Sequence, residues 1–180
     1  HVSTQPFDLR LPDNIVTKMN PEGQVYTDHL YCDGQGNAIF KLDTWEINIL
    51  EKERQQEGFV CWFRNIPNKG SSLCIQYELG SEIKAHFPDF IVVRRVNNQY
   101  EFSILEPHYI GYSDSVPKLK GMAKYSQLCS SVKRNEMIRI IEMPTGKRIQ
   151  RIDVAKSSIR NEVKCLNDYD DLNNLFAKLN

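Results

Sequence analysis

The sequence predicts an α/β protein in which a mixed β-sheet is flanked by helices. Strand-like and helix-like stretches succeed one another along most of the chain, and two of the strand-like stretches are almost continuously apolar. Apolar strands of this kind are typical of the centre of a sheet that is covered on both faces. The chain has 180 residues, of which 41% are hydrophobic, so it can form a packed core.

Residues 1–24 are interpreted as an N-terminal arm, because they contain three prolines and little periodicity, and residues 25–180 as one domain. The chain begins with His rather than Met, so we expect the C-terminal fragment of a larger protein. No apolar run approaches the roughly 20 residues that cross a bilayer, and no membrane partner is expected. The five cysteines include no CxxC pair, which favours reduced thiols in a cytoplasmic setting.

The first half of the domain is expected to contain a hairpin, a helix and four strands. A D-G-Q-G turn at 33–36 indicates the hairpin. Asp43 or Thr44 is suited to cap a helix that ends before Gly58, with Glu51 and Glu53 as exposed charges on it. The short connections between the four strands favour an antiparallel meander. These strands are expected at 59–65, 72–79, 89–95 and 99–106.

The second half is expected to contain a helix, two paired strands and a final helix. The apolar positions of 115–132 predict a helix, although Gly121 is unfavourable inside it. Strands are predicted at 137–143 and 147–154, joined by a P-T-G turn, and 169–179 forms an amphipathic helix.

Charge leaves nucleic-acid binding undecided. Lysine plus arginine and aspartate plus glutamate number 23 each, so a basic field over the whole domain is absent. A local basic cluster remains, and it has two interpretations: DNA contacts, above all through Lys118, Lys120 and Lys124, or a solvated helix face. The cluster consists of Lys118, Lys120, Lys124, Lys133 and Arg134.

Two carboxylates are predicted to meet although 17 positions separate them in the sequence. One strand begins at Asp89, and the next ends near Glu106 after a turn at Asn97-Asn98. Folding back at this turn brings the two residues side by side, and alternation along the strand puts His108 on the same face as Glu106. Two adjacent carboxylates repel each other unless a cation lies between them. Mg²⁺ or Mn²⁺ fits such a pair, with the Pro107 carbonyl as a further ligand.

The sequence resembles the PD-(D/E)xK, or restriction-endonuclease-like, nucleases. Pro88-Asp89 followed by Glu106-Pro107-His108 resembles the motif itself. The order of motifs is similar to that in the C-terminal nuclease domain of type III restriction subunits and of helicase-fused bacterial defence proteins. These motifs are Trp45-Glu46, the C-W-F-R-N stretch at 61–65, Phe87-Pro88-Asp89-Phe90 and Leu105-Glu106.

The resemblance implies that Asp89 and Glu106 bind the metal and that Glu46 supports them through water. His108 stands where the family usually has Lys, whose charge steadies the attacking water and the developing transition state. Three interpretations stay open: a working histidine with an ordinary pKa near 6.5, a lysine recruited from Lys118, Lys120 or Lys124, or a dead site.

The function expected from this resemblance is metal-dependent hydrolysis of DNA phosphodiester bonds by the nuclease end of a helicase or translocase protein in bacterial defence. Two alternatives remain. The same fold with a degenerate site would be a DNA-binding module, or the chain would be a protein-interaction domain in which Asp89 and Glu106 do not face one another.

Overall fold

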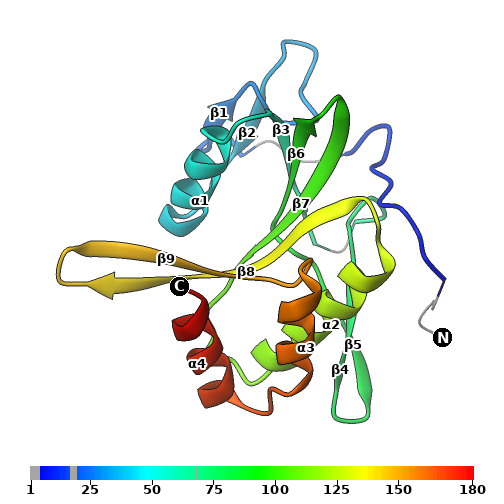
Figure 1. Cartoon of the computed structure of the whole chain (residues 1–180). Coiled ribbons are helices and arrows are strands. Elements are labelled where there is room, and N and C mark those ends of the chain that lie inside the picture. Colours follow the sequence, from blue (N-terminus) through cyan, green and yellow to red (C-terminus); the bar gives the residue numbers. More distant parts are fainter. Residues whose placement is uncertain (1–4, 17–19, 68) are drawn as a thin grey trace.

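A computed structural model describes residues 5–16, 20–67 and 69–180, and it shows a mixed five-stranded sheet with helices on both faces (Figure 1). The predicted α/β class is therefore confirmed. The sheet order is β3-β6-β7-β8-β9, formed by Phe59–Arg64, Phe90–Val96, Gln99–Pro107, Val132–Met143 and Gly146–Asp153. The helices are α1 (Thr44–Arg54), α2 (Ser115–Leu128), α3 (Ser157–Lys164) and α4 (Tyr169–Leu179). No helix in the described part of the chain is long and apolar enough to span a membrane.

Two small hairpins accompany the central sheet. The first pairs β1 (Gln24–Tyr26) with β2 (Ala38–Phe40) and has the expected turn at 33–36, closed by a hydrogen bond from the Gly36 N–H to the Asp33 carbonyl at 3.0 Å. The second pairs β4 (Ile75–Leu79) with β5 (Glu82–His86). Both hairpins lie outside the five-stranded sheet.

The β4–β5 hairpin corrects the predicted meander. The stretch 72–79 was expected in the sheet, but β4 pairs only with β5, and β3 lies directly beside β6. The hairpin packs on α2 instead. Gly121 permits this contact, because a Cβ atom there would lie 2.7 Å from the Cβ of Tyr77. The glycine that weakens α2 as a helix is thus required for its packing.

The second half contains two further departures from the prediction. The helix expected over 115–132 ends at Leu128, and β8 begins at Val132 rather than at 137. This earlier start lets β8 pair with β7 in parallel, with α2 as the crossover between them. The helix α3 was not predicted. The β8–β9 hairpin and α4 agree with the prediction.

The core has two parts, one on each face of the sheet. Ile49 and Leu50 of α1 pack with Trp62, Phe90 and Leu105. On the other face, α2, α3 and α4 bury side chains such as Leu119, Val163 and Phe176 against the sheet. Residues 5–16 add a short contact to this second side, because Phe7 bridges to Cys129. The two hydrophobic layers hold the strand ends of β6 and β7 in fixed positions.

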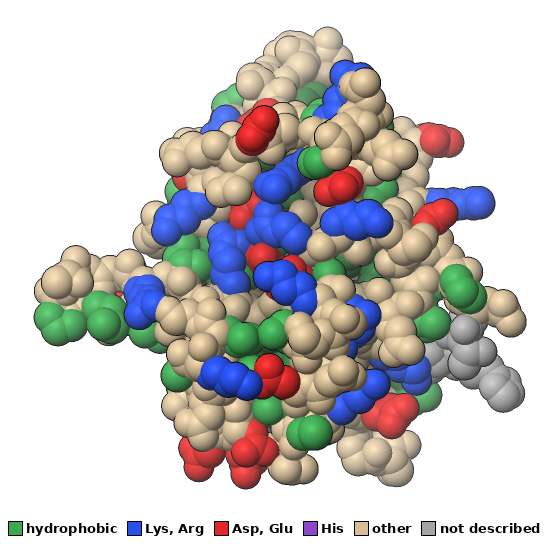
Figure 2. Space-filling model, in the orientation of Figure 1, with side chains coloured by type: hydrophobic (Ala, Val, Ile, Leu, Met, Phe, Trp, Pro, Cys, Tyr) green, Lys and Arg blue, Asp and Glu red, His purple; other side chains and the backbone are tan. Residues whose placement is uncertain are grey.

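Glu53 of α1, expected as an exposed charge, is 1% exposed. Its carboxylate lies 2.8 Å from Arg134 Nη1 and 2.9 Å from Arg151 Nη1. Glu136 of β8 contacts the same two arginines. Figure 2 shows Lys and Arg side chains gathered across the middle of this face, over the region where α1 meets β8 and β9. Glu53 can be buried because two arginines on the sheet neutralise its charge.

Candidate functional site

The β6–β7 hairpin brings Asp89 and Glu106 together. Its register pairs Phe90 with Leu105, so the two acidic residues come next along the same ladder. The turn at Asn97 and Asn98 has two residues with positive φ, of 48° and 63°, as a tight hairpin connection requires. The Asp89 N–H donates to Glu106 Oε2 at 3.3 Å. The predicted meeting of the two residues is thus found, and we call Asp89, Glu106 and Glu46 the acid centre.

Arg64 of β3 links Asp89 to Glu46 of α1. Its Nη1 lies 2.7 Å from Glu46 Oε1 and 2.9 Å from Asp89 Oδ1. The other carboxylate oxygen of Glu46 accepts from the Asp43 N–H at 2.8 Å, as part of the capping box that begins α1. Glu46 was expected to support the site through water; in the structure its carboxylate contacts the Arg64 guanidinium, which also contacts Asp89.

Two buried histidines flank the carboxylate of Glu106. Glu106 Oε1 lies 3.2 Å from His108 Nδ1, so these side chains share a face as predicted. The other ring nitrogen of His108 lies 2.9 Å from Ser115 Oγ. His86 of β5 places its Nε2 3.7 Å from Glu106 Oε2, and this buried nitrogen makes no hydrogen bond within the described chain.

Burial dominates the electrostatics of these groups. It raises the pKa of Glu106 to about 8 against the opposing charge of Lys118. Burial, with the neighbouring charge of Glu106, also raises the pKa of Asp89 to about 7. Burial lowers the pKa of His86 to about 3 and that of His108 to about 4. At neutral pH both histidines are therefore uncharged, and the two carboxyl groups are readily stabilised by a cation.

Only one of the three candidate lysines lies at the acid centre. Lys118 forms an ion pair with Asp114 at 3.1 Å, and its charge lowers the pKa of Glu106, His86 and His108. The Tyr77 hydroxyl donates to the same Asp114 carboxylate at 3.0 Å. Lys120 and Lys124 instead line a hollow between α2 and the β4–β5 hairpin.

Asp89 and Glu106 are the residues of the acid centre that could hold a divalent ion such as Mg²⁺ or Mn²⁺. Within residues 5–16, 20–67 and 69–180, no three His, Cys, Asp or Glu side chains are grouped to hold a metal ion. Mg²⁺ commonly binds through one or two carboxylates, with waters and phosphate oxygens completing the shell. Asp89 and Glu106 provide such a pair, and Pro107, whose carbonyl is the further predicted ligand, ends β7 beside them.

Comparison with known proteins gives a family for the chain. The YagJ family matches residues 27–180. The chain belongs to the YagJ family. Protein YagJ of Escherichia coli (strain K12) is 31% identical over 173 residues, which cover 90% of this chain and 70% of the relative. No solved structure matches the chain.

The range matched by the YagJ family contains the whole acid centre and several residues that sequence reasoning did not assign to it. Arg64 stood in the quoted C-W-F-R-N stretch, but its role depends on the pairing of β3 with β6. His86 and Tyr77 were missed because the β4–β5 hairpin was not recognised. Asp114 lies directly before α2, one helical turn from Lys118, and this local spacing of four residues is a signal that could have identified the ion pair.

Proposed function

We propose that this YagJ-family domain is a nuclease that hydrolyses DNA phosphodiester bonds with Mg²⁺ or Mn²⁺. The observation that carries the proposal is the pair of buried carboxyl groups at the end of the β6–β7 hairpin, Asp89 and Glu106, both with raised pKa values. Perturbed carboxyl groups of this kind concentrate at functional sites. The proposal further rests on the resemblance to the PD-(D/E)xK motif.

Asp89, Glu106 and the Pro107 carbonyl would hold the metal. The bound ion would polarise the scissile phosphate and lower the pKa of a water molecule. Arg64 would hold Asp89 and Glu46 in place through its contacts at 2.9 and 2.7 Å. His108 would orient Glu106, since its ring bridges that carboxylate and Ser115.

We assign to Lys118 the role of the motif lysine, whose usual position in the sequence is taken here by His108. It is the candidate whose charge acts on Glu106. A neutral His108 cannot supply a positive charge, whereas a lysine ammonium can stabilise the charge that develops on the phosphate. By the same resemblance, the domain would act with the helicase or translocase region of a larger bacterial defence protein.

The test is cleavage of supercoiled plasmid by the purified protein with Mn²⁺, Mg²⁺ or EDTA. Asp89→Asn and Glu106→Gln should abolish nicking, and the exposed Asp170→Asn should leave it unchanged. Lys118→Ala should lower the rate by about 10²–10³-fold, as expected for loss of one group that stabilises transition-state charge. The control for this variant is Lys147→Ala, which removes a lysine of the β8–β9 hairpin and should leave the rate unchanged. Undiminished cleavage by Asp89→Asn would refute the proposal.

A DNA-binding module without catalysis is the second candidate. It is favoured by Arg64, whose positive charge already lies between Glu46 and Asp89 where a metal ion would otherwise relieve their repulsion. DNA binding that weakens steeply between two salt concentrations, together with no nicking in Mn²⁺, would support this candidate. Absence of both DNA binding and divalent-metal binding would leave the protein-interaction alternative.

A further inference from the structure

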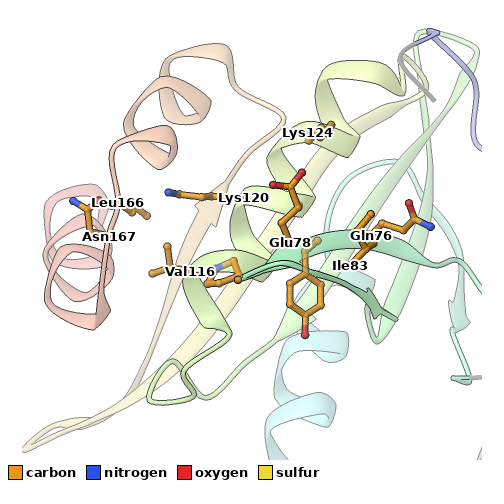
Figure 3. Close-up of a pocket in the computed structure, with 12 residues that line it drawn as sticks. Gln76, Glu78, Ile83, Val116, Lys120, Lys124, Leu166 and Asn167 are labelled. Atoms are coloured by element: carbon orange, nitrogen blue, oxygen red, sulfur yellow. The ribbon is translucent and has the colours of Figure 1, made fainter. Parts of the chain in front are cut away.

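A hollow of about 470 Å³ lies between α2, the β4–β5 hairpin and the connection from α3 to α4. Its volume falls within the range of about 300–1,000 Å³ that is usual for small-molecule sites. Apolar walls come from both sides, with Ile83 on the hairpin, Val116 on α2 and Leu166 after α3. Figure 3 shows Lys120 extending from α2 toward Leu166 and Asn167, and Glu78 rising from β4 toward α2.

The charged groups of this hollow are uncommitted. Lys120 and Lys124 are exposed and separated by one helical turn, and within the described chain neither forms an ion pair. Glu78, which also lines the hollow, forms no ion pair among the described residues either. No residue of the acid centre lines the hollow; Tyr77 lines it, and its hydroxyl donates to Asp114, the partner of Lys118.

A second hollow continues from the first along α2 and α3. It is lined by the same Lys120 and Lys124 together with Arg160 and Lys164, and no acidic residue lines it. Arg160 is held in place, because its Nη1 donates to the carbonyls of Val154 and Ala155 at 3.0 and 2.6 Å. Four positive side chains thus border this second hollow, which we call the α2–α3 groove. The first hollow, with its apolar walls, is called the α2–β4 recess.

We propose that this surface binds a nucleotide, with its base in the α2–β4 recess and its phosphate between Lys120 and Lys124. An apolar recess beside a row of cations matches the chemistry of a nucleotide, which joins an apolar ring face to an anionic phosphate. The α2–α3 groove offers Arg160 and Lys164 to the next phosphates, so the favoured source is a single strand of nucleic acid. A free mononucleotide carries the same chemistry.

Glu78 gives this site a base preference. A carboxylate accepts hydrogen bonds and cannot donate them, so it is suited to the two N–H donors of an exocyclic amino group, whereas the single N–H of thymine or uracil lies between two carbonyl oxygens that repel a carboxylate. Adenine and cytosine strands should therefore bind more tightly than thymine strands. The site is separate from the acid centre and does not depend on the proposed nuclease activity.

The experiment is fluorescence anisotropy with labelled single-stranded dA and dT oligonucleotides of about 12 nucleotides, in EDTA so that no metal-dependent reaction occurs. Lys120→Gln/Lys124→Gln should weaken dA binding about tenfold. It should also reduce the slope of log affinity against log salt by about 0.7, as expected when the one phosphate between these lysines is no longer neutralised on a single strand. The control Lys41→Gln/Lys147→Gln removes two exposed lysines outside the groove and should change neither quantity. Glu78→Gln should reduce the preference for dA over dT.

The outcomes separate the alternatives. Competition by AMP would show that a free nucleotide occupies the recess, and dA binding without such competition would show that a strand is needed. Equal effects of the two double variants, or no binding at low salt, would overturn the proposal. Because binding is measured in EDTA and the lysine and Glu78 variants leave the acid centre unchanged, failure of the nuclease proposal would leave this result intact.

Discussion

At the scale of single residues, Glu106 holds a proton that an exposed carboxyl group would have lost. Its folded pKa is raised to about 8, above the ordinary value near 4.5. Between these values the folded state binds more protons than the unfolded state, so stability falls as pH rises through this range. This destabilisation at neutral pH is typical of a site selected for function rather than for folding.

Glu106→Gln should therefore stabilise the fold at pH 8 and have a smaller effect at pH 5. The amide keeps an acceptor for the Asp89 N–H and cannot ionise. Since one pKa unit corresponds to about 1.4 kcal/mol, we expect a gain of about 1–3 kcal/mol at pH 8. Thermal unfolding at the two pH values measures it, with the exposed Glu57→Gln as the control. Equal effects of Glu106→Gln at pH 5 and pH 8 would contradict the burial of an ionisable Glu106.

His108 gives a second prediction at this scale. Burial lowers its pKa to about 4, so its ring stays neutral between pH 6 and pH 8. If the domain cleaves DNA, the ratio of the rates of the unmodified protein and His108→Gln should be constant over this range. The carboxyl groups titrate in both proteins, so their effects on the two rates cancel in the ratio. A ratio that changes tenfold between pH 6 and pH 8 would instead make His108 a titrating base.

At the scale of elements, α1 is fastened to β8 and β9 by charge as well as by its apolar side chains. Burial opposes ionisation of Glu53, but the hydrogen bonds and charges of Arg134 and Arg151 outweigh it and lower the pKa of Glu53. Because α1 also carries Glu46, this network helps to hold the helix that reaches the acid centre. The network is thus a structural support for the site.

Glu53→Gln should lower the free energy of unfolding by roughly 2–3 kcal/mol. Removing one partner of a fully buried pair costs about 3–5 kcal/mol, and the two arginines are partly solvated, with side chains 21% and 23% exposed. Urea unfolding gives the value. Glu51→Gln, on the same helix and paired with Arg54 at the surface, should cost about 0–1 kcal/mol. A similar loss in both variants would refute a special role for the buried network.

The elements also show which parts of the fold can be predicted from sequence. The β6–β7 hairpin was predictable because two apolar runs flank an Asn-Asn turn, and this local pattern sets the register that joins Asp89 to Glu106. The β4–β5 hairpin was not, because only β4 shows a clear apolar alternation, whereas β5 is short and mostly exposed, so the partner of β4 could not be recognised. Glu53 looked exposed because its neutralising arginines lie far away in the sequence.

At the scale of the whole molecule, the site is assembled from elements that no local pattern connects. β3 supplies Arg64, β5 supplies His86, and the start of α2 supplies Ser115 and Lys118. Because β7 and β8 pair in parallel, α2 must cross over one face of the sheet between them, and its first turn lies next to the end of β7. Sequence periodicity predicts α2 as a helix but not this direction, so it could not choose Lys118 over Lys120. Tertiary structure was needed for that distinction.

The assembled site predicts how metal binding depends on pH. If the proposed divalent ion binds Asp89 and Glu106, it must displace the protons that these carboxyl groups hold with pKa values of about 7 and 8. Mn²⁺ affinity should therefore rise at least about tenfold per pH unit from pH 6 to pH 7 and level off above pH 8. Calorimetric titration in two buffers with different ionisation enthalpies would measure both the affinity and the protons released. In Asp89→Asn, the affinity and the proton release should both decrease. An Mn²⁺ affinity that is independent of pH would place the ion away from these two carboxyl groups.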